Sequence, residues 1–158
     1  RLVDFSYPPE QLRPLLDAGH SITILDHHVS AVRKLDGFEH VGLTTYLDVD
    51  RCGASLVWDV FKMDSAFPGP RINGMLPIVA YVEDHDLWRH SLANSQTIKA
   101  AMRSYPLDFG VWDDLSNDLC GDRAEIVKSG LHIQRRERQI VDDSVSKAVN
   151  RALITLQI

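Results

Sequence analysis

The chain has few cysteines, no long apolar run and no excess of positive charge, and each shortage excludes a class of protein. Its two cysteines, Cys52 and Cys120, are far apart and in no metal-binding spacing, so neither a disulfide framework nor a zinc ribbon is indicated. A net charge of −5 argues against a generic nucleic-acid or membrane-surface binder. Because no apolar run approaches membrane-spanning length and nothing resembles a signal peptide, we expect a cytoplasmic protein without membrane contacts.

What is present suits a globular fold. The chain has 158 residues, of which 44% are hydrophobic, and this is enough to bury a core. It begins at Arg1 with strand-like residues in place of an initiator Met, and it ends on ALITLQI, which resembles the start of a strand. We therefore expect a fragment that is truncated inside a sheet at its beginning and that starts a further C-terminal domain at residues 152–158.

The first 28 residues predict a strand, a helix and a second strand. Residues 1–3 resemble the end of a buried strand, prolines near position 8 favour a helix start, and residues 22–25 supply the next strand. This order is typical of a βαβ unit with parallel strands. Asp4 and the triplet at 26–28 would then lie at neighbouring carboxyl ends, where open α/β sheets place their chemistry.

Further elements follow along the chain. Residues 41–49 carry enough β-formers for a strand or two, and residues 53–63 have the apolar spacing of a helix. An apolar helix is predicted over 72–82, with Pro77 in its first turn or at a bend. It leads to the acidic segment VEDHDLW at 82–88.

After residue 92 the pattern is helical. Two short helices are followed by an amphipathic helix over about 124–151, whose length suggests a connector. We therefore predict an α/β fold with a parallel sheet flanked by helices, followed by a helical connector. The expected domains are an α/β domain over 1–92 and a helical part with the connector over 93–151.

Three polar clusters follow apolar elements and carry the candidate chemistry. They are Asp4, the triplet Asp26-His27-His28, and the acidic group around His85. Carboxylates bind hard divalent ions, and imidazole adds selectivity for Mn²⁺ and other transition ions. Each cluster also has a simpler interpretation, namely a turn or cap residue, a hydrogen-bonded histidine pair and a solvated acidic loop.

Four ordered blocks of this sequence resemble a known superfamily. The blocks are DFSYP at 4–8, LDHHVSAV at 25–32, RCGASLVWDVF at 51–61 and VEDHDLW at 82–88. Together they resemble the DHH phosphoesterase superfamily, and within it the oligoribonuclease-like members that are described as exopolyphosphatase-related. The resemblance covers about the first 90 residues strongly and the helical remainder loosely.

The resemblance implies a role for particular residues. Asp4, His27 and Asp84 match metal ligands, and His28 matches the histidine that faces the substrate phosphate. Asp26 would orient His27 by accepting a hydrogen bond from its far ring nitrogen.

Two further roles concern support and phosphate binding. Asp86, like Asp26, would orient a metal ligand without binding the metal itself. Gly53, Ala54 and Ser55 match a small-residue block whose backbone N–H groups at a helix start can receive a phosphate.

The resemblance implies an activity, but this sequence lacks one block of the family's pattern. The implied activity is hydrolysis of phosphodiester or phosphoanhydride bonds, most of all in short oligonucleotides, with two Mn²⁺ ions, or Mg²⁺ or another divalent ion, in the complete enzyme. The family's opening His-x-Asp-x-Asp block is absent, so we expect this fragment to be inactive or to hold one ion weakly.

Several alternatives stay open. The substrate could be polyphosphate or a small nucleotide, and the domain could bind a nucleotide without cleaving it. A structural zinc site formed by His27, His28 and Asp84 is a further alternative, and a homodimer is also open.

Aromatic and basic residues allow two interpretations each. Trp88, Phe5 and Tyr7 could stack on a base or pack into the core. Arginines 135, 136 and 138 could hold an oligonucleotide backbone, or form a solvated helix face interlaced with Glu137.

Overall fold

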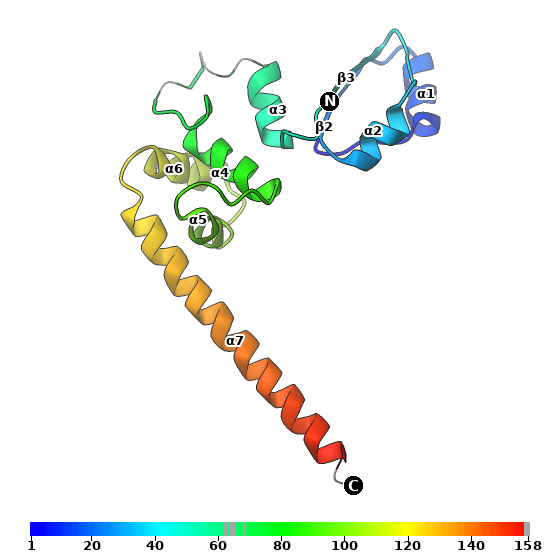
Figure 1. The fold of residues 1–158 in the computed structure, drawn as a ribbon. Helices are drawn as coiled ribbons and strands as arrows, with labels where there is room; N and C mark the ends of the chain where they lie inside the picture. Colours follow the sequence, from blue (N-terminus) through cyan, green and yellow to red (C-terminus); the bar gives the residue numbers. More distant parts are fainter. Residues whose placement is uncertain (62, 64–65, 68, 157–158) are drawn as a thin grey trace. The chain divides into compact units, whose positions relative to one another are not determined.

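The computed structural model describes residues 1–61, 63, 66–67 and 69–156, and the chain divides into two compact units. Unit 1 is Arg1–Leu92 and unit 2 is Ala93–Ile158. Unit 1 contains a parallel sheet with helices, and unit 2 ends in a long helix (Figure 1). The predicted α/β class is therefore confirmed.

Three parallel strands form the sheet of unit 1. They are β1 (Leu2–Val3), β2 (Ile22–Asp26) and β3 (Leu43–Leu47), in the order β1-β2-β3. In this register Val3 lies opposite Leu25, so the residues that follow β1 and the last residue of β2 lie at the same edge. The sheet thus brings the segment after Val3 next to Asp26, as the βαβ pattern predicts.

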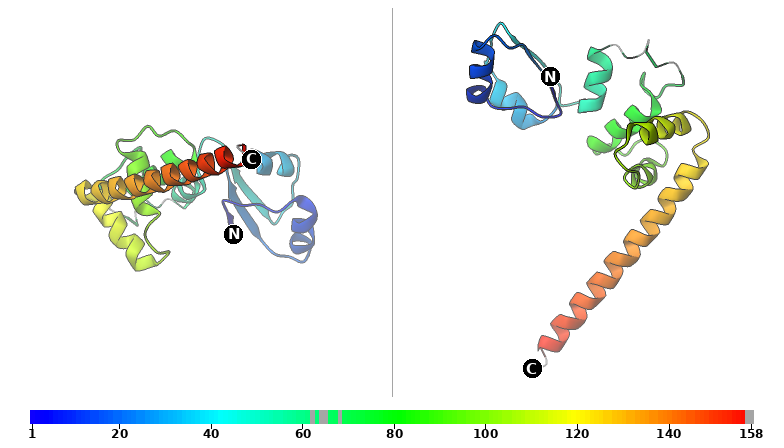
Figure 2. Two further views of the ribbon diagram at one scale, coloured as in Figure 1. Left: turned by 90° about the horizontal axis from the view of Figure 1, so that it is seen from below. Right: turned by 180° about the vertical axis from the view of Figure 1, so that it is seen from behind.

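Two helices connect the strands and cover one face of the sheet. They are α1 (Pro9–Asp17) and α2 (Val29–Leu35), shown in blue and light blue in Figures 1 and 2. Pro9 begins α1, where a missing N–H costs nothing. Leucines from both helices pack with Ile24 of β2 in one apolar cluster, formed by Leu12, Leu16, Ile24 and Leu35. This core fixes the strands whose ends carry the candidate site.

A third helix, α3 (Gly53–Val60), packs against β1 and β2, and Val3 and Tyr46 on the face opposite Ile24 stay about two-fifths exposed. Leu25 is fully buried, and strand alternation points it away from Ile24. The helix expected over 53–63 ends at Val60, and residues 62 and 64–65 lie outside the described residues.

The fourth helix, α4 (Pro77–Asp86), differs from its predicted extent of 72–82. Pro77 occupies the first turn because its ring is tolerated only there. Ile72 instead pairs with Met75 across a turn formed by Asn73 and Gly74, both with positive φ. Since the helix starts later and runs on to Asp86, its last turn carries the acidic residues that were expected to follow it.

Unit 2 consists of α5 (Ser95–Met102), α6 (Phe109–Cys120) and α7 (Ala124–Leu156). Helix α5 packs against α7 at Gly130, where a Cβ atom would lie 2.0 Å from the carbonyl oxygen of Thr97. A residue with a Cβ atom therefore does not fit at position 130, where α5 and α7 are in contact. The connector role of α7 stays a prediction.

The strand expected over 152–158 is wrong, because α7 continues through Leu156. Residues 157–158 lie outside the described part. No glycine or proline interrupts residues 131–156, so each added residue gains a helical hydrogen bond, whereas a lone strand has no partner.

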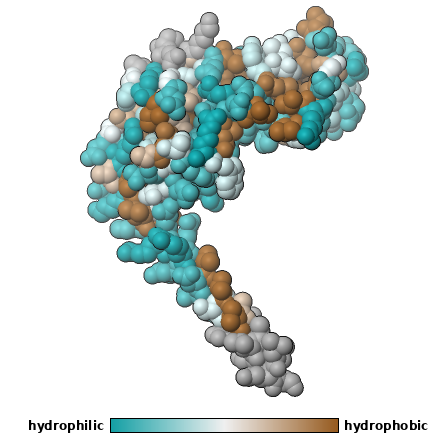
Figure 3. Space-filling model, viewed as in Figure 1, coloured by the Kyte–Doolittle hydropathy of each residue, from teal (hydrophilic) through white to brown (hydrophobic). Residues whose placement is uncertain are grey.

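Four apolar side chains on the later part of α7, namely Ile140, Val141, Val145 and Val149, are half-exposed. Figure 3 shows brown, hydrophobic residues along this part of the helix. Among the described residues, no helix combines the length and the apolar character that crossing a bilayer requires.

Candidate metal centre

The ends of β1 and β2 place an acid and two imidazoles together. Asp4 follows β1 with a left-handed backbone (φ 61°), and its N–H donates to the carbonyl of Leu25 (2.8 Å). His27 and His28 follow Asp26, the last residue of β2. One ligand atom each of Asp4, His27 and His28 lies within 4.8 Å of the others. The strand-end prediction therefore brings three of the named side chains to one place.

The Nε2 atom of His27 faces two carboxylates. It lies 3.0 Å from Asp4 Oδ1 and 3.2 Å from Asp86 Oδ2. The imidazole is 11% exposed, whereas both acids are at least two-fifths exposed, so the buried ring holds one side of a site that is open to solvent. Two carboxylates and an imidazole suit Mn²⁺ and related divalent ions.

Asp86 reaches this group where the resemblance points to Asp84. Residues two apart on a helix point about 200° apart, so only one of these acids can face His27. The carboxylate of Asp84, which is 4% exposed, instead accepts from Ser91 N (2.8 Å), Ser91 Oγ (2.6 Å) and Leu92 N (3.4 Å). Asp84 therefore organises the loop after α4, and Asp86 takes the position beside His27.

Asp26 contacts the other histidine of the pair. Its Oδ1 lies 2.7 Å from His28 Nδ1 and accepts from the backbone N–H groups of His27 (2.8 Å) and His28 (3.1 Å). The expected bond from Asp26 to the far ring nitrogen of His27 is therefore wrong. The nearly fully buried carboxylate orients His28 instead.

The contact between Asp26 and His28 changes both pKa values. Burial raises the pKa of Asp26, but hydrogen bonds from the His28 ring and from the backbone of His28 and His27 outweigh it, so the pKa falls below 3.8. The same hydrogen bond raises the pKa of His28 above 6.5 against the opposing effect of burial, and the charges of Asp26, Asp4 and Asp86 add to the increase. Ionised Asp26 and protonated His28 therefore coexist between these two pKa values.

The start of α3 contributes close packing to the site. A Cβ atom on Gly53 would lie 2.7 Å from Asp4 Cβ and 3.0 Å from Asp4 Oδ1. Ala54 is exposed in the same turn, and the N–H groups of the first helical turn have no acceptor within the helix. Gly53 is therefore the residue that lets Asp4 rest against the helix start.

Ser55 has a structural role in the same turn. Its hydroxyl accepts from Cys52 N (3.0 Å) and its N–H donates to Cys52 Sγ (3.4 Å), which is a reciprocal cap. Both groups of this fully buried residue are engaged, so the phosphate-binding prediction for Ser55 is not supported.

Replacing Gly53 with alanine should force Asp4 to move, because the Asp4 Cβ atom is the nearest neighbour of the added methyl group. The added methyl group must displace Asp4 from its position. We expect roughly a 10-fold loss of Mn²⁺ affinity, because changes to a residue that positions a metal ligand usually cost about this much. Calorimetric titration of Mn²⁺ measures it. Gly121→Ala is the control, since its Cβ would lie no closer than 3.8 Å to its nearest neighbours. Equal affinities in the two variants would contradict the packing argument.

An ion-pair network that the sequence did not reveal holds α3 and α4 together. Arg51 Nε donates to the buried Glu83 Oε2 (2.8 Å), and Arg51 Nη1 lies 2.7 Å from Asp59 Oδ2. Arg89 Nη1 lies 3.2 Å from Glu83 Oε1. Since Glu83 precedes Asp86 by less than one turn, this network fixes the helix end that carries Asp86.

Exposed aromatic residues flank the acidic and imidazole groups in sequence. Trp88 is 77% exposed at φ 56°, so the packing interpretation is wrong for it. Phe5 and Tyr7 form an edge-to-face pair (ring centroids 4.7 Å apart) and are about half-exposed. Stacking of a base on any of them stays a prediction.

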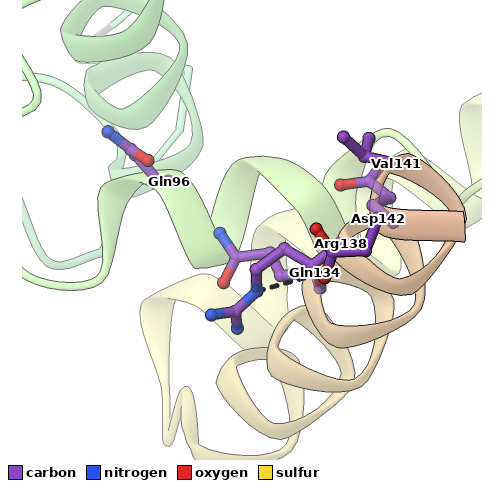
Figure 4. A pocket seen from close by; sticks show the side chains of 6 residues that line it. Gln96, Gln134, Arg138, Val141 and Asp142 are labelled. Atoms are coloured by element: carbon purple, nitrogen blue, oxygen red, sulfur yellow. Dashed lines mark hydrogen bonds between the residues drawn. The ribbon is translucent and has the colours of Figure 1, made fainter. Parts of the chain in front are cut away.

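The predicted basic face of α7 lies in unit 2. Arg138 lines a hollow of about 480 Å³, together with carboxylate and amide side chains, and its Nε donates to the carbonyl of Gln134 (3.3 Å; Figure 4). Glu137 and Asp142 line the same hollow and offset its charge. Binding of an oligonucleotide backbone by these arginines stays a prediction.

Comparison with known proteins gives one distant relative. Uncharacterized protein R106 of Acanthamoeba polyphaga mimivirus is 21% identical over 123 residues. The alignment covers 78% of this chain and 27% of the relative, so the chain spans about a quarter of the length of that protein. No protein-family model and no solved structure matches the chain.

Proposed function

We propose that this chain carries the centre of a divalent-metal-dependent phosphoesterase whose leading substrates are short oligonucleotides. The observation that carries the proposal is the position of His27 Nε2, within 3.2 Å of both Asp4 and Asp86, with His28 in the same group. Asp4, His27 and Asp86 would hold Mn²⁺, with Mg²⁺ as the alternative. The chemistry that such an ion supplies when bound is Lewis acidity toward a phosphoryl oxygen and toward water.

His28 has the properties of a proton donor at this site. Its Nδ1 is held by Asp26, so Nε2 is the ring nitrogen left to meet a substrate. The pKa of His28 is raised by that hydrogen bond, which keeps the ring cationic at higher pH than an ordinary histidine. A cationic ring can donate a hydrogen bond to a phosphoryl oxygen or protonate a leaving oxygen.

The geometry supports the zinc alternative less well. That alternative needs His27, His28 and Asp84 in one closed shell, but the Asp84 carboxylate is engaged by Ser91 and Leu92. Polyphosphate and a small nucleotide are the alternative substrates of the proposed enzyme. Nucleotide binding without cleavage is an alternative to the enzymatic activity itself. A homodimer and a cytoplasmic location also stay proposals.

Release of mononucleotides from a short oligomer tests the proposal. The assay uses the full-length gene product, in which we expect turnover that requires Mn²⁺, is abolished by a chelator and is lost in Asp4→Asn, because that carboxylate lies 3.0 Å from His27 Nε2. Asp36→Asn, an exposed acid at the end of α2, is the control. If the full-length wild-type protein leaves oligomer, polyphosphate and nucleotide uncleaved in Mn²⁺, the proposed activity is refuted.

A further inference from the structure

A small hollow lies beside the candidate metal centre in unit 1. Its volume is about 220 Å³. Sites for drug-sized ligands usually measure about 300–1,000 Å³, so this space suits one compact group better than a whole nucleotide. The charged and polar residues that line it include Asp4, Asp26, His28, Ser30 and Lys34.

One wall of the hollow offers groups that bind anions. Ser30 and Lys34 are four residues apart on α2, so their side chains lie on the same helix face. Within the part of the chain that the structure describes, Lys34 has no ion-pair partner, although Asp4 and Asp26 line the same hollow. The Lys34 ammonium and the Ser30 hydroxyl lie beside the candidate metal centre, where one phosphate would bind. Both can donate hydrogen bonds to a second anionic group.

We propose that this hollow is a subsite in which Lys34 and Ser30 bind a second phosphate group of the substrate, adjacent to the one that is hydrolysed. The inference rests on the proposed function and narrows its substrates to molecules with two neighbouring phosphates. The second phosphate has two sources, the 5′ end of a short oligonucleotide or the next unit of a polyphosphate chain. Phosphate is favoured over a second metal ion because Lys34 has no counter-ion among the described residues, whereas Asp4 lies against His27 and Asp26 lies against His28.

A binding experiment tests the subsite without requiring turnover. The probes are diadenylate with and without a 5′-phosphate, both with a phosphorothioate linkage to slow hydrolysis, and tripolyphosphate. Affinities are measured by calorimetry with Mn²⁺ present for wild type, Lys34→Ala and Arg33→Ala. Arg33 is the matched control, since it is exposed, basic and adjacent on α2 but does not line the hollow.

We expect Lys34→Ala to weaken binding of the 5′-phosphorylated probe by roughly 10-fold, the equivalent of one hydrogen bond to a charged group. Binding of the unphosphorylated probe should not change, and Arg33→Ala should resemble wild type. If Lys34→Ala loses affinity for tripolyphosphate alone, polyphosphate is the source of the second phosphate. Equal losses for both diadenylates, equal losses in both variants, or unchanged affinities in Lys34→Ala would overturn the subsite.

The same proteins separate this inference from the proposed function. If the full-length wild-type protein shows no Mn²⁺-dependent hydrolysis but its phosphate binding depends on Lys34, the subsite stands and the phosphoesterase activity falls. If hydrolysis requires Asp4 but no probe distinguishes Lys34→Ala from Arg33→Ala, the activity stands and the subsite falls.

Discussion

Asp86→Asn is expected to weaken Mn²⁺ binding by roughly 100-fold or more, because even changes behind a ligand cost 10–100-fold. The physical reason is the position of its Oδ2, 3.2 Å from His27 Nε2, which makes it the second carboxylate of the centre. An asparagine of the same shape keeps the fold but removes the negative charge that compensates a divalent ion. Calorimetric titration of Mn²⁺ into both proteins gives the two affinities.

Asp84 provides the matched control for this experiment. It is on the same helix, two residues earlier, and its carboxylate accepts from Ser91 and Leu92. Asp84→Ala leaves these donors without that acceptor and should cost about 1–3 kcal/mol of unfolding free energy. Its Mn²⁺ affinity, measured where the chain is folded, should match wild type. If Asp84→Ala loses Mn²⁺ while Asp86→Asn keeps it, our assignment of the two acids is reversed.

The confusion between these two acids shows what the sequence pattern leaves undetermined. The apolar run predicted a helix that ends before the acidic segment, whereas the segment forms the last turn of α4, and the side chain that faces His27 depends on the phase of the helix. That phase follows from the start at Pro77, five residues later than the apolar pattern suggests, and from the Arg51–Glu83 ion pair. A pairing between residues 32 positions apart in the chain leaves no local trace.

The strand ends were easier to predict, because parallel pairing alone brings their residues together. Val3 lies opposite Leu25, which puts Asp4 next to the triplet at 26–28 whatever the side-chain rotamers are. The rotamers decide the finer contacts. Asp26 turns to His28 and its own backbone neighbours, a local arrangement that satisfies three donors with one oxygen. Only Asp4, His27 and His28 therefore follow from topology.

In the full-length gene product, His28→Ala is expected to lower kcat/KM for oligonucleotide hydrolysis by about 10²–10⁴-fold, the usual contribution of a proton donor in the transition state. Because the hydrogen bond to Asp26 raises the pKa of His28, the protonated ring persists above pH 6.5. Wild-type kcat/KM should therefore fall as the pH rises through that raised pKa. The variant should lack this alkaline limb, and pH profiles of both proteins measure it.

The control for this prediction is His20→Ala, which removes an exposed imidazole that takes no part in the group around Asp4. It should reproduce the wild-type profile. Binding of Mn²⁺ to His28→Ala should persist, since Asp4, His27 and Asp86 remain in place. A variant that loses metal affinity and turnover together would make His28 a ligand. A variant with wild-type turnover and an unchanged alkaline limb would leave proton donation to another group.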